Sequence, residues 1–301
     1  MLPELPYAAW EPTKTTLHLW SQVAGKIKLQ YAPFRNHWWN VTLHPSARGL
    51  TTQAIPLGDG AFFEMFFDFV DHRFVVESSR AHAPAGFALH DGLSVAEFYA
   101  RVAQTLGGFG IDVAIRARPY GVPVTTPFAQ DSEHRSYDAT AARRYWEVLC
   151  WSAQAMERFA VPFAGKQSVP QLFWHSFDLA LARFSGRRNP QLKGNIVERE
   201  AYSHEVIAFG FWPGDANVPA PTYYTYTAPE PAALIERPLE PTGAAWVASG
   251  SGHLGCIGYD AIRGAPDPAA ALEAFFESGY RAGAAAAGWD TDSLTLRELP
   301  E

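Results

Sequence analysis

The chain has 301 residues, of which 48% are hydrophobic and 18% charged, so it can form a sizeable core and its composition excludes global disorder. Its formal net charge of −7 leaves no basic excess to neutralise phosphates, which excludes DNA or RNA as a main partner. The N-terminus lacks the basic and apolar regions of a signal peptide, and no apolar run reaches the roughly 18 residues of a spanning helix, so we expect a cytoplasmic protein without a membrane partner.

Hydrophobic spacing divides the chain into a first half at residues 1–119, a connector at residues 120–138 and a second half at residues 139–301. In the first half, some segments have apolar residues at helical spacing and others alternate as strands do. The patterns predict, in chain order, a short helix at Thr16–Ala24, strands at Lys26–Tyr31 and His37–Leu43, a hairpin of Ala61–Val70 with Arg73–Glu77, a helix after Ser94, and a closing strand at Asp112–Arg118.

Two helices have clear start signals. Ser94 is followed three residues later by Glu97, which is the spacing of a capping box, and the pair Gly107-Gly108 predicts where that helix ends. In the second half, Asp138 is the expected N-cap of a helix at Thr140–Phe159, because an apolar stripe at helical spacing follows it.

The rest of the second half alternates as strands and ends in a helix. The predicted strands are Leu172–Phe184, Glu205–Trp212, Thr222–Thr227 and Cys256–Ile262. Asp267 and Pro268 suit the N-cap and first position of the final helix, in which the small residues of Gly283–Ala287 would allow close approach to a neighbour. Gly250–Gly255 has the spelling GxGxxG, but a dinucleotide motif follows a strand and opens a helix, so a hairpin or loop is expected.

The element order favours an α+β fold, with mostly antiparallel sheet and helices on one face. The two halves share the order helix, strands, helix, and each contains an Ala-Gly-Lys triplet, at Ala24–Lys26 and at Ala164–Lys166. These markers suggest an internal duplication with two similar halves. Whether the halves pack as one domain stays open.

Three titratable residues are candidates for catalysis, namely His204, Glu205 and Asp178. Adjacent residues of a strand point to opposite faces, so a single site would use only one of His204 and Glu205 directly, and a structural hydrogen-bonded pair is the commoner outcome. Asp178 lies inside a predicted strand, where a buried carboxylate needs a partner. A pocket carboxylate and a structural ion pair both fit that position.

Large aromatic side chains lie beside titratable groups in three clusters, around residues 36–39, 173–178 and 203–214. This combination is typical of a shaped ligand pocket, although a lone histidine among aromatic residues is more often simply packed in a core. We therefore expect a small-molecule site between the two halves, with these candidate ligand-binding residues: His37, Trp38, Trp174, Arg183, Arg187 and Trp212.

The sequence predicts no metal site and leaves the cofactor unknown. The two cysteines, Cys150 and Cys256, form no CxxC pair and no zinc-ligand spacing. The signatures of nucleoside triphosphatases, serine hydrolases and zinc proteases, GxxxxGK[ST], GxSxG and HExxH, are absent from the sequence.

Several motifs together resemble an uncharacterised bacterial family, domain-of-unknown-function family five-nine-nine-six. The resemblance extends over nearly the whole chain and implies one full-length family unit, but no activity, substrate or catalytic residue. The motifs that carry it are Asn36-His37-Trp38-Trp39, Arg48-Gly49-Leu50, Phe67-Asp68-Phe69, Phe177-Asp178-Leu179-Ala180, Arg183-Phe184-Ser185-Gly186-Arg187, Ala201-Tyr202-Ser203-His204-Glu205 and Gly210-Phe211-Trp212-Pro213-Gly214.

Two functional hypotheses remain, and the sequence does not decide the reaction or the oligomeric state. In the first, the protein is an enzyme of unknown reaction or another metabolite-handling protein with an aromatic-lined pocket. In the second, it is a non-catalytic binding or protein-interaction module whose exposed aromatic residues, including Tyr223–Tyr226, form a docking surface next to the proline-rich stretch Pro229–Pro241.

Overall fold

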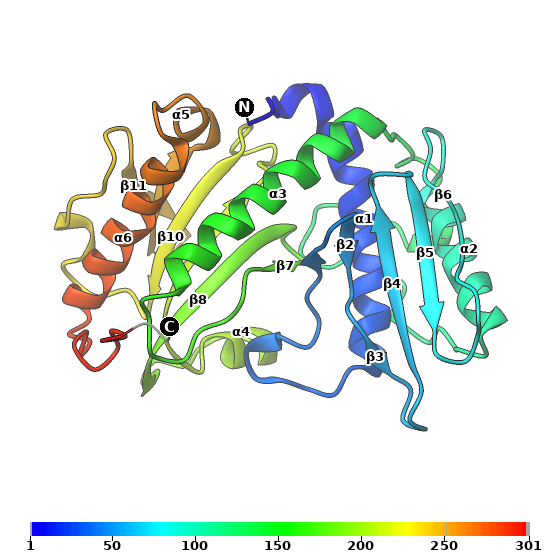
Figure 1. The fold of residues 1–301 in the computed structure, drawn as a ribbon, viewed down its shortest axis with the longest axis horizontal. Helices are drawn as coiled ribbons and strands as arrows, with labels where there is room; N and C mark the ends of the chain where they lie inside the picture. Colours follow the sequence, from blue (N-terminus) through cyan, green and yellow to red (C-terminus); the bar gives the residue numbers. More distant parts are fainter. Residues whose placement is uncertain (1, 251, 299–301) are drawn as a thin grey trace.

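The computed structural model describes residues 2–250 and 252–298 and contains two antiparallel sheets of six strands each, with helices packed against both (Figure 1). Each sheet is built from one half of the sequence, and the two lie side by side along the longest axis of the molecule (Figure 1). This arrangement confirms the predicted α+β class with mostly antiparallel sheet.

The N-terminal sheet lies within residues 44–88, and its longest strands form the hairpin predicted around Asp71. Its strands are β1 (His44–Pro45), β2 (Gly49–Thr51), β3 (Ile55–Pro56), β4 (Phe62–Asp68), β5 (Arg73–Ser78) and β6 (Ala85–Ala88). They pair in the order β1-β2-β4-β5-β6, and β3 also pairs with β4.

Helices α1 (Tyr7–Tyr31) and α2 (Val95–Gly108) pack against this sheet through aromatic side chains. The ring centre of Phe98 on α2 lies 5.8 Å from the ring centre of Phe67, 5.0 Å from that of Phe74 and 4.9 Å from that of Trp20 on α1. The capping box predicted at Ser94 is present in full at the start of α2.

The C-terminal sheet has the strand order β11-β12-β10-β9-β8-β7. Its strands are β7 (Gln171–Phe173), β8 (Asp178–Arg188), β9 (His204–Trp212), β10 (Thr222–Ala228), β11 (Ala245–Ser249) and β12 (Gly252–Gly258). Helices α3 (Ala139–Ala160) and α6 (Pro268–Ala286) cover its outer side, with Asp138 and Asp267 as the predicted N-caps. A Cβ atom at Gly283 would lie only 2.2 Å from Oγ1 of Thr227, so the small run allows the expected close approach.

Short elements complete the chain between these helices and strands. They are the helices α4 (Ile196–Ala201) and α5 (Tyr259–Arg263) and the 3₁₀ turns η1 (Asn36–Trp38), η2 (Phe128–Gln130) and η3 (Leu234–Glu236). The connector at residues 120–138 contains η2 and otherwise has no helix or strand.

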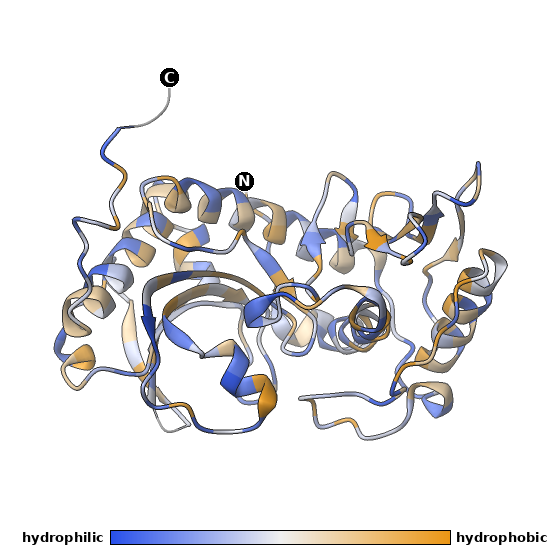
Figure 2. Cartoon of the chain, turned by 90° about the horizontal axis from the view of Figure 1, so that it is seen from below, coloured by the Kyte–Doolittle hydropathy of each residue, from blue (hydrophilic) through white to orange (hydrophobic). Residues whose placement is uncertain are grey.

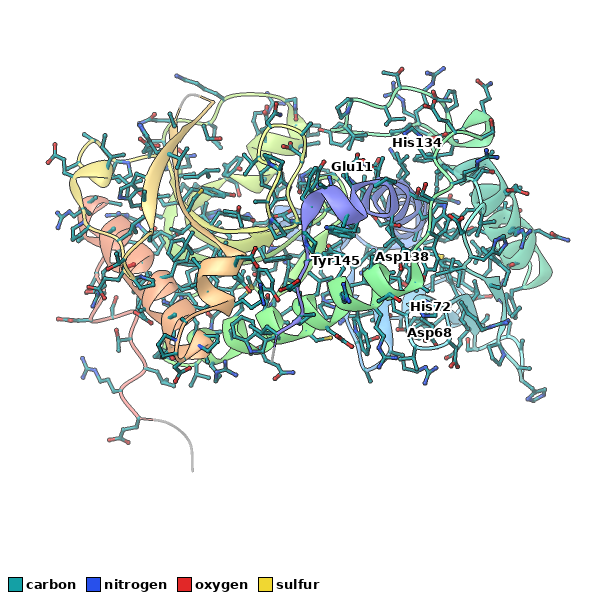
Figure 3. All side chains as sticks on the ribbon, turned by 90° about the horizontal axis from the view of Figure 1, so that it is seen from above. Glu11, Asp68, His72, His134, Asp138 and Tyr145 are labelled. Carbon is teal, nitrogen blue, oxygen red and sulfur yellow. The ribbon has the colours of Figure 1, made fainter. Side chains whose placement is uncertain are left out.

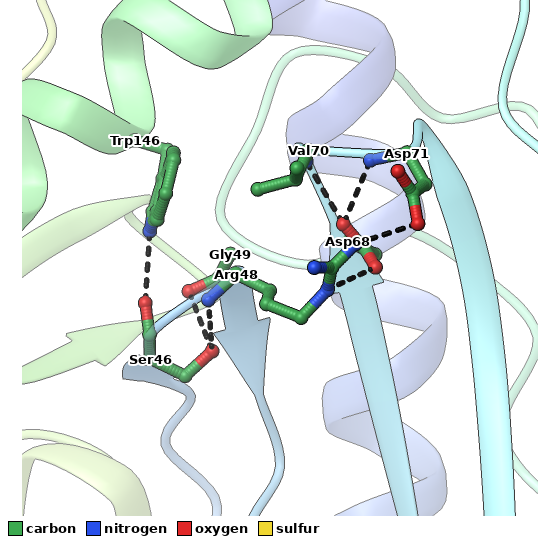
Figure 4. Close-up of polar contacts among 7 residues, drawn as sticks. All are labelled: Ser46, Arg48, Gly49, Asp68, Val70, Asp71 and Trp146. Atoms are coloured by element: carbon green, nitrogen blue, oxygen red, sulfur yellow. Dashed lines mark hydrogen bonds and ion pairs between the residues drawn. The ribbon is translucent and has the colours of Figure 1, made fainter.

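The two sheets are joined by backbone and side-chain contacts around β1 and β7. Leu43 and Leu172 exchange two backbone hydrogen bonds of 2.9 and 2.7 Å, and the indole N–H of Trp146 on α3 donates to the carbonyl oxygen of Ser46 (Figure 4). Nearby, the Arg48 guanidinium donates to the Asp68 carboxylate at 2.7 Å (Figure 4). Two family-like motifs, Arg48-Gly49-Leu50 and Phe67-Asp68-Phe69, therefore meet in a structural ion pair.

The start of α3 lies next to the β4–β5 hairpin. In the view from above, Asp138 is beside Asp68 and His72 (Figure 3). Nδ1 of His72 lies 2.8 Å from the Tyr137 hydroxyl oxygen. The hairpin histidine, which a turn position would leave exposed, is thus half-buried against the connector.

Two predicted strands of the first half are wrong because α1 is much longer than expected. Residues Lys26–Tyr31 form the last turns of α1. The buried residues of α1 lie on all sides of the helix, so its sequence shows no apolar stripe at helical spacing from which its length could be predicted. Asp112–Arg118 has no regular secondary structure. Its backbone forms hydrogen bonds with side chains of α1 rather than with a neighbouring strand. For example, Nε2 of Gln30 donates to the carbonyl oxygen of Asp112 at 3.1 Å.

Other predicted strands are interrupted by turns. The strand predicted at His37–Leu43 is also wrong. The segment starts in the 3₁₀ turn η1, where the backbone is left-handed at His37 (φ 59°) and Trp38 (φ 61°). The predicted strand at Leu172–Phe184 is split into β7 and β8 by a turn, and Cys256–Ile262 ends as a strand at Gly258, where α5 follows.

The GxGxxG segment is in a hairpin, as expected from its context. Residues of β12 pair with those of β11, while Ser251 lies outside the described residues. The two Ala-Gly-Lys triplets lie in unlike structure, one inside α1 and the other in the loop after α3. They do not align the halves, so the internal duplication stays a prediction.

Candidate functional site

The C-terminal sheet arches around α4, while α3 and α6 pack on its outer side (Figure 2). Because side chains alternate along a strand, Asp178, Ala180 and Phe184 of β8 lie on the inner side of this arch. We call this side the concave face, and its residues on the three central strands include Asp178, Ala180, Phe184, Ala208, Gly210, Trp212, Tyr224 and Tyr226.

Asp178 is a buried carboxylate at one end of the concave face. Among the residues that the structure describes, both of its hydrogen-bond partners are hydroxyl groups, from Ser176 and Tyr224, rather than cations. A carboxylate has about four acceptor positions, so two donors leave it able to accept more hydrogen bonds. The structural ion pair considered for Asp178 is not formed within residues 2–250 and 252–298.

Tyrosines continue the polar series from Asp178 across the face. Tyr224 stacks on Tyr226 with ring centres 6.1 Å apart, and the hydroxyl oxygens of Tyr226 and Tyr202 are 3.3 Å apart. Burial, with the nearby Asp178 charge, raises the pKa of Tyr224 well above its usual value, and burial does the same for Tyr226. Both phenols therefore stay protonated and can donate hydrogen bonds at neutral pH.

At the opposite end, η1 and α4 meet over the concave face. The Glu200 carboxylate accepts from the backbone N–H of His37 at 3.0 Å, and the Trp38 indole donates to the Val197 carbonyl oxygen at 3.0 Å. These bonds hold two consecutive non-glycine residues in left-handed backbone, which costs about 1–3 kcal/mol for each. The imidazole of His37 stacks on Phe184 with ring centres 4.3 Å apart.

Lys166, from the loop after α3, completes this cluster. Its ammonium donates to Nε2 of His37 at 2.7 Å and lies 5.3 Å from the ring centre of Trp39. The ring of His204 lies 5.8 Å from that of His37. Burial lowers the pKa of His37, and the Lys166 charge lowers it further, so His37 is a neutral hydrogen-bond acceptor at pH 7.

The predicted residues Arg183, Glu205 and Arg187 lie on the outer side of the sheet instead. Arg183 is 1% exposed, and its guanidinium is surrounded by the rings of Phe159, Phe163, Phe209 and Tyr280, with its central carbon 3.5 Å from the Phe159 ring centre. Burial lowers the pKa of Arg183 to about 10. This packing makes Arg183 part of the core between β8, α3 and α6.

Glu205 and Arg187 form an ion pair at the end of α6. The guanidinium lies 2.7 Å from the Glu205 carboxylate and donates to the carbonyl oxygens of Ala287 and Gly288 at 2.7 and 3.1 Å. The last carbonyls of a helix have no partner within the helix, so Arg187 caps α6 and Glu205 holds Arg187 in place.

The two remaining predicted residues, Trp174 and Trp212, lie apart from the His37 cluster. Trp174 is buried in the β7–β8 turn against Gly25 of α1, where a Cβ atom would lie 2.1 Å from the indole ring. Trp212 is half-buried on the concave face, at the end of β9 near Asp178. The structure therefore brings together His37 and His204, with Trp38 adjoining, and places Asp178 and Trp212 at the other end of the same face.

Sequence reasoning missed three members of this arrangement: Lys166, Glu200 and Tyr202. Lys166 had a signal, because the chain contains only five lysines and this one follows a repeated Ala-Gly marker. Tyr202 lies in the family-like motif Ala201-Tyr202-Ser203-His204-Glu205, but its place on this face depends, like that of Glu200, on the short helix α4 inside the β8–β9 connection.

Two grooves open elsewhere on the surface. One of about 400 Å³ lies on β4 and β5 beside the cross-strand pair Glu64 and Glu77, and one of about 470 Å³ lies between the end of α6 and Glu230 and is lined in part by Glu205. Within the described ranges, no group of three or more His, Cys, Asp or Glu residues could hold a metal ion, and no helix is long and apolar enough to cross a membrane.

The tyrosines proposed for a docking surface are not exposed. Tyr223 is fully buried, with its hydroxyl oxygen 2.8 Å from that of Ser152, while Tyr224 and Tyr226 are half-buried on the concave face. Of this stretch, only the half-buried rings of Tyr224 and Tyr226 reach the surface, so the docking-surface hypothesis stays a prediction.

Comparison with known proteins agrees with the motifs noted above. The model of a family described as "Family of unknown function (DUF5996)" matches residues 2–296. No curated protein and no solved structure matches the chain. Because the family model covers almost the full length, the resemblance is confirmed, and this protein is a member of the DUF5996 family of unknown function.

Proposed function

We propose that the protein binds a small organic molecule on the concave face of the C-terminal sheet and acts on it as an enzyme. The observation that carries this proposal is the polar series on one face, which runs from Asp178 through Tyr224, Tyr226 and Tyr202 to α4 and His37. A few polar groups set among aromatic rings are typical of the lining of ligand sites.

The chemistry of the face indicates the kind of ligand. Asp178 can accept hydrogen bonds from hydroxyl or amine groups, and Tyr224 and Tyr226 present partly accessible aromatic surface. The floor beneath them consists of small residues, including Ala208 and Gly210, and the Tyr224 ring lies directly over Gly210. We therefore expect a ligand with several hydroxyl or amino groups and a flat or apolar portion.

Native mass spectrometry of untagged protein, purified without chelator and compared with the denatured mass, is the first test. Excess mass in the native state would identify a bound molecule directly. If the protein is bare, thermal shift with a panel of sugars, polyols, amino acids and hydroxy acids follows. The variant Asp178→Asn should abolish a shift seen for the wild type.

Glu77→Gln, on the N-terminal sheet, is the matched control and should retain the shift, because Glu77 lies on the other sheet. A bare native mass together with no stabilising compound would contradict the proposal. So would a shift that Asp178→Asn leaves intact.

A further inference from the structure

The side-chain amine of Lys166 is hydrogen-bonded to a potential base, the imidazole of His37. Its Nζ lies 2.7 Å from Nε2 of His37, and among the described residues no carboxylate oxygen lies within 4.0 Å of it. The residue itself is exposed to solvent in the loop between α3 and β7, so small reagents and substrates can reach it. An ammonium that is hydrogen-bonded to a neutral imidazole, and not to a carboxylate, can hand over its proton.

The hydrogen bonds of His37 fix which ring nitrogen accepts that proton. Nδ1 lies 3.2 Å from the carbonyl oxygens of both Glu200 and Ala201, which have no hydrogen to donate. Nδ1 must therefore carry the hydrogen, and the lone pair of Nε2 faces Lys166. The left-handed backbone at His37, held by Glu200, keeps the ring in this orientation.

The surroundings of Lys166 act on its charge in two directions. The ammonium lies 5.1 Å from the ring centre of Phe184 and 5.3 Å from that of Trp39, and such cation–π contacts favour the charged form. Burial lowers the pKa of Lys166, and Glu200 opposes this. A nucleophile, a base within hydrogen-bond reach and a third group that orients the base form the arrangement by which enzymes activate amines, thiols and hydroxyls.

We infer that Lys166 is a nucleophilic amine that condenses with the carbonyl group of an aldehyde or ketone ligand. His37 takes a proton from the ammonium, and the nitrogen lone pair then forms a bond to the carbonyl carbon while the C=O π pair moves to oxygen. The proton on His37 passes to that oxygen, and His37 then carries a second proton from the nitrogen of this adduct to its new hydroxyl group. Water leaves, and the freed nitrogen lone pair closes a protonated imine. One ammonium and one carbonyl compound thus give one iminium ion and one water molecule.

This inference rests on the proposed function for its location, because Lys166 lies at one end of the same concave face, and it adds a carbonyl group to the expected ligand. The test is independent of the rest of the ligand. Purified protein is treated at pH 7 with propanal and sodium cyanoborohydride, and the alkylation rate of each lysine is measured by peptide mass spectrometry. Lys193 is also exposed and supplies the internal reference.

Lys166 should react about tenfold or more faster than Lys193, which is within the range that a positioned base contributes. His37→Asn should reduce the Lys166 rate to that of Lys193 and move its pH profile upward, because asparagine tolerates left-handed backbone but cannot take the proton. Lys166→Arg keeps the charge beside the rings and should abolish the rapidly labelled peptide.

Equal rates at Lys166 and Lys193 in the wild type would overturn the inference, and so would an unchanged rate in folded His37→Asn protein. If His37→Asn fails to fold, the wild-type comparison of the two lysines still decides. Propanal has no group for Asp178 to bind. Rapid labelling of Lys166 in a protein that binds no compound of the panel would therefore leave this inference standing and contradict only the small-molecule site.

Discussion

Tyr224 on β10 reaches across the backbone of Gly210 on β9 to donate its phenol hydroxyl to Asp178 on β8. A Cβ atom at Gly210 would lie 2.2 Å from Cζ of Tyr224, so only glycine allows the ring to lie flat at this point. Gly210 is therefore required for the hydrogen bond by which Tyr224 connects Asp178 to the rest of the polar series on the concave face.

Gly210→Ala is expected to displace the Tyr224 ring and break its bond to Asp178. The added methyl group overpacks a closely packed strand and leaves a buried carboxylate short of a donor, so the free energy of unfolding should fall by about 1–3 kcal/mol. Urea denaturation measures this change. Gly258→Ala is the control, because no atom lies within 4 Å of its Cβ position, and equal effects of the two substitutions would contradict the argument.

The elements that sequence patterns predicted correctly are those whose signals are local. Capping residues such as Ser94 and Asp138 act within one turn of helix, and the alternation of β4, β5 and β10 follows from having one face more deeply buried than the other. Helix α1 was underestimated because it is buried on several sides, against α2 and β3 and also against α3 and the β7–β8 turn, which removes the amphipathic stripe on which such predictions depend.

The candidate site was predictable only in part for a similar reason. The aromatic and titratable clusters indicated His37, His204 and Asp178, and these lie on one face. The same clusters also indicated Arg183 and Glu205, since spacing along a strand cannot show which face a ligand uses. The pairing of Lys166 with His37 joins residues 129 positions apart and depends on α4, so no local pattern contained it.

Two buried histidines should make the protein sensitive to acid. Burial lowers the pKa of both His18 and His44 to about 3, with the nearby lysines Lys14 and Lys28, respectively, adding to the shift. Both are neutral in the folded state but gain a proton near pH 6.5 when unfolded. Their contribution to stability is therefore complete above pH 6.5 and is lost as the pH falls from 6.5 towards 3.

The slope of stability against pH tests this directly. Each buried histidine should cost about 1.4 kcal/mol of unfolding free energy for every unit of pH below 6.5. Urea denaturation at pH 7, 6, 5 and 4 should show a shallower decline for His44→Gln than for wild type. His82→Gln, at an exposed position, should leave the decline as it is. Identical slopes for all three proteins would refute the assignment.

Arg183 should tolerate methionine better than lysine. Its guanidinium stacks between the rings of Phe159 and Tyr280, and a planar cation can do this where an ammonium cannot. Arg183→Lys keeps a buried charge without that stacking and should lower the free energy of unfolding by about 3 kcal/mol or more, whereas Arg183→Met removes the charge and should cost less. The opposite ranking in chemical denaturation would show that the charge itself is required there.

The ion pair of Arg187 with Glu205 should stabilise the end of α6 and leave the ligand site unaffected. Arg187→Ala removes the donors to the carbonyl oxygens of Ala287 and Gly288, at a cost of about 1 kcal/mol or less because the guanidinium is half exposed. Hydrogen exchange should then be faster at the Trp289 amide, which bonds to the carbonyl oxygen of Ala284 at 2.9 Å.

The exposed pair Arg143 with Glu147 on α3 supplies the control, since Arg143→Ala should leave exchange at α6 unchanged. Glu205→Gln distinguishes the structural role from the catalytic one considered for this residue. If it loosens α6 and leaves the thermal shift of a bound ligand intact, Glu205 acts only through Arg187. Loss of the ligand shift with unaltered exchange at Trp289 would instead place Glu205 in contact with the ligand and move the site to the groove that it lines.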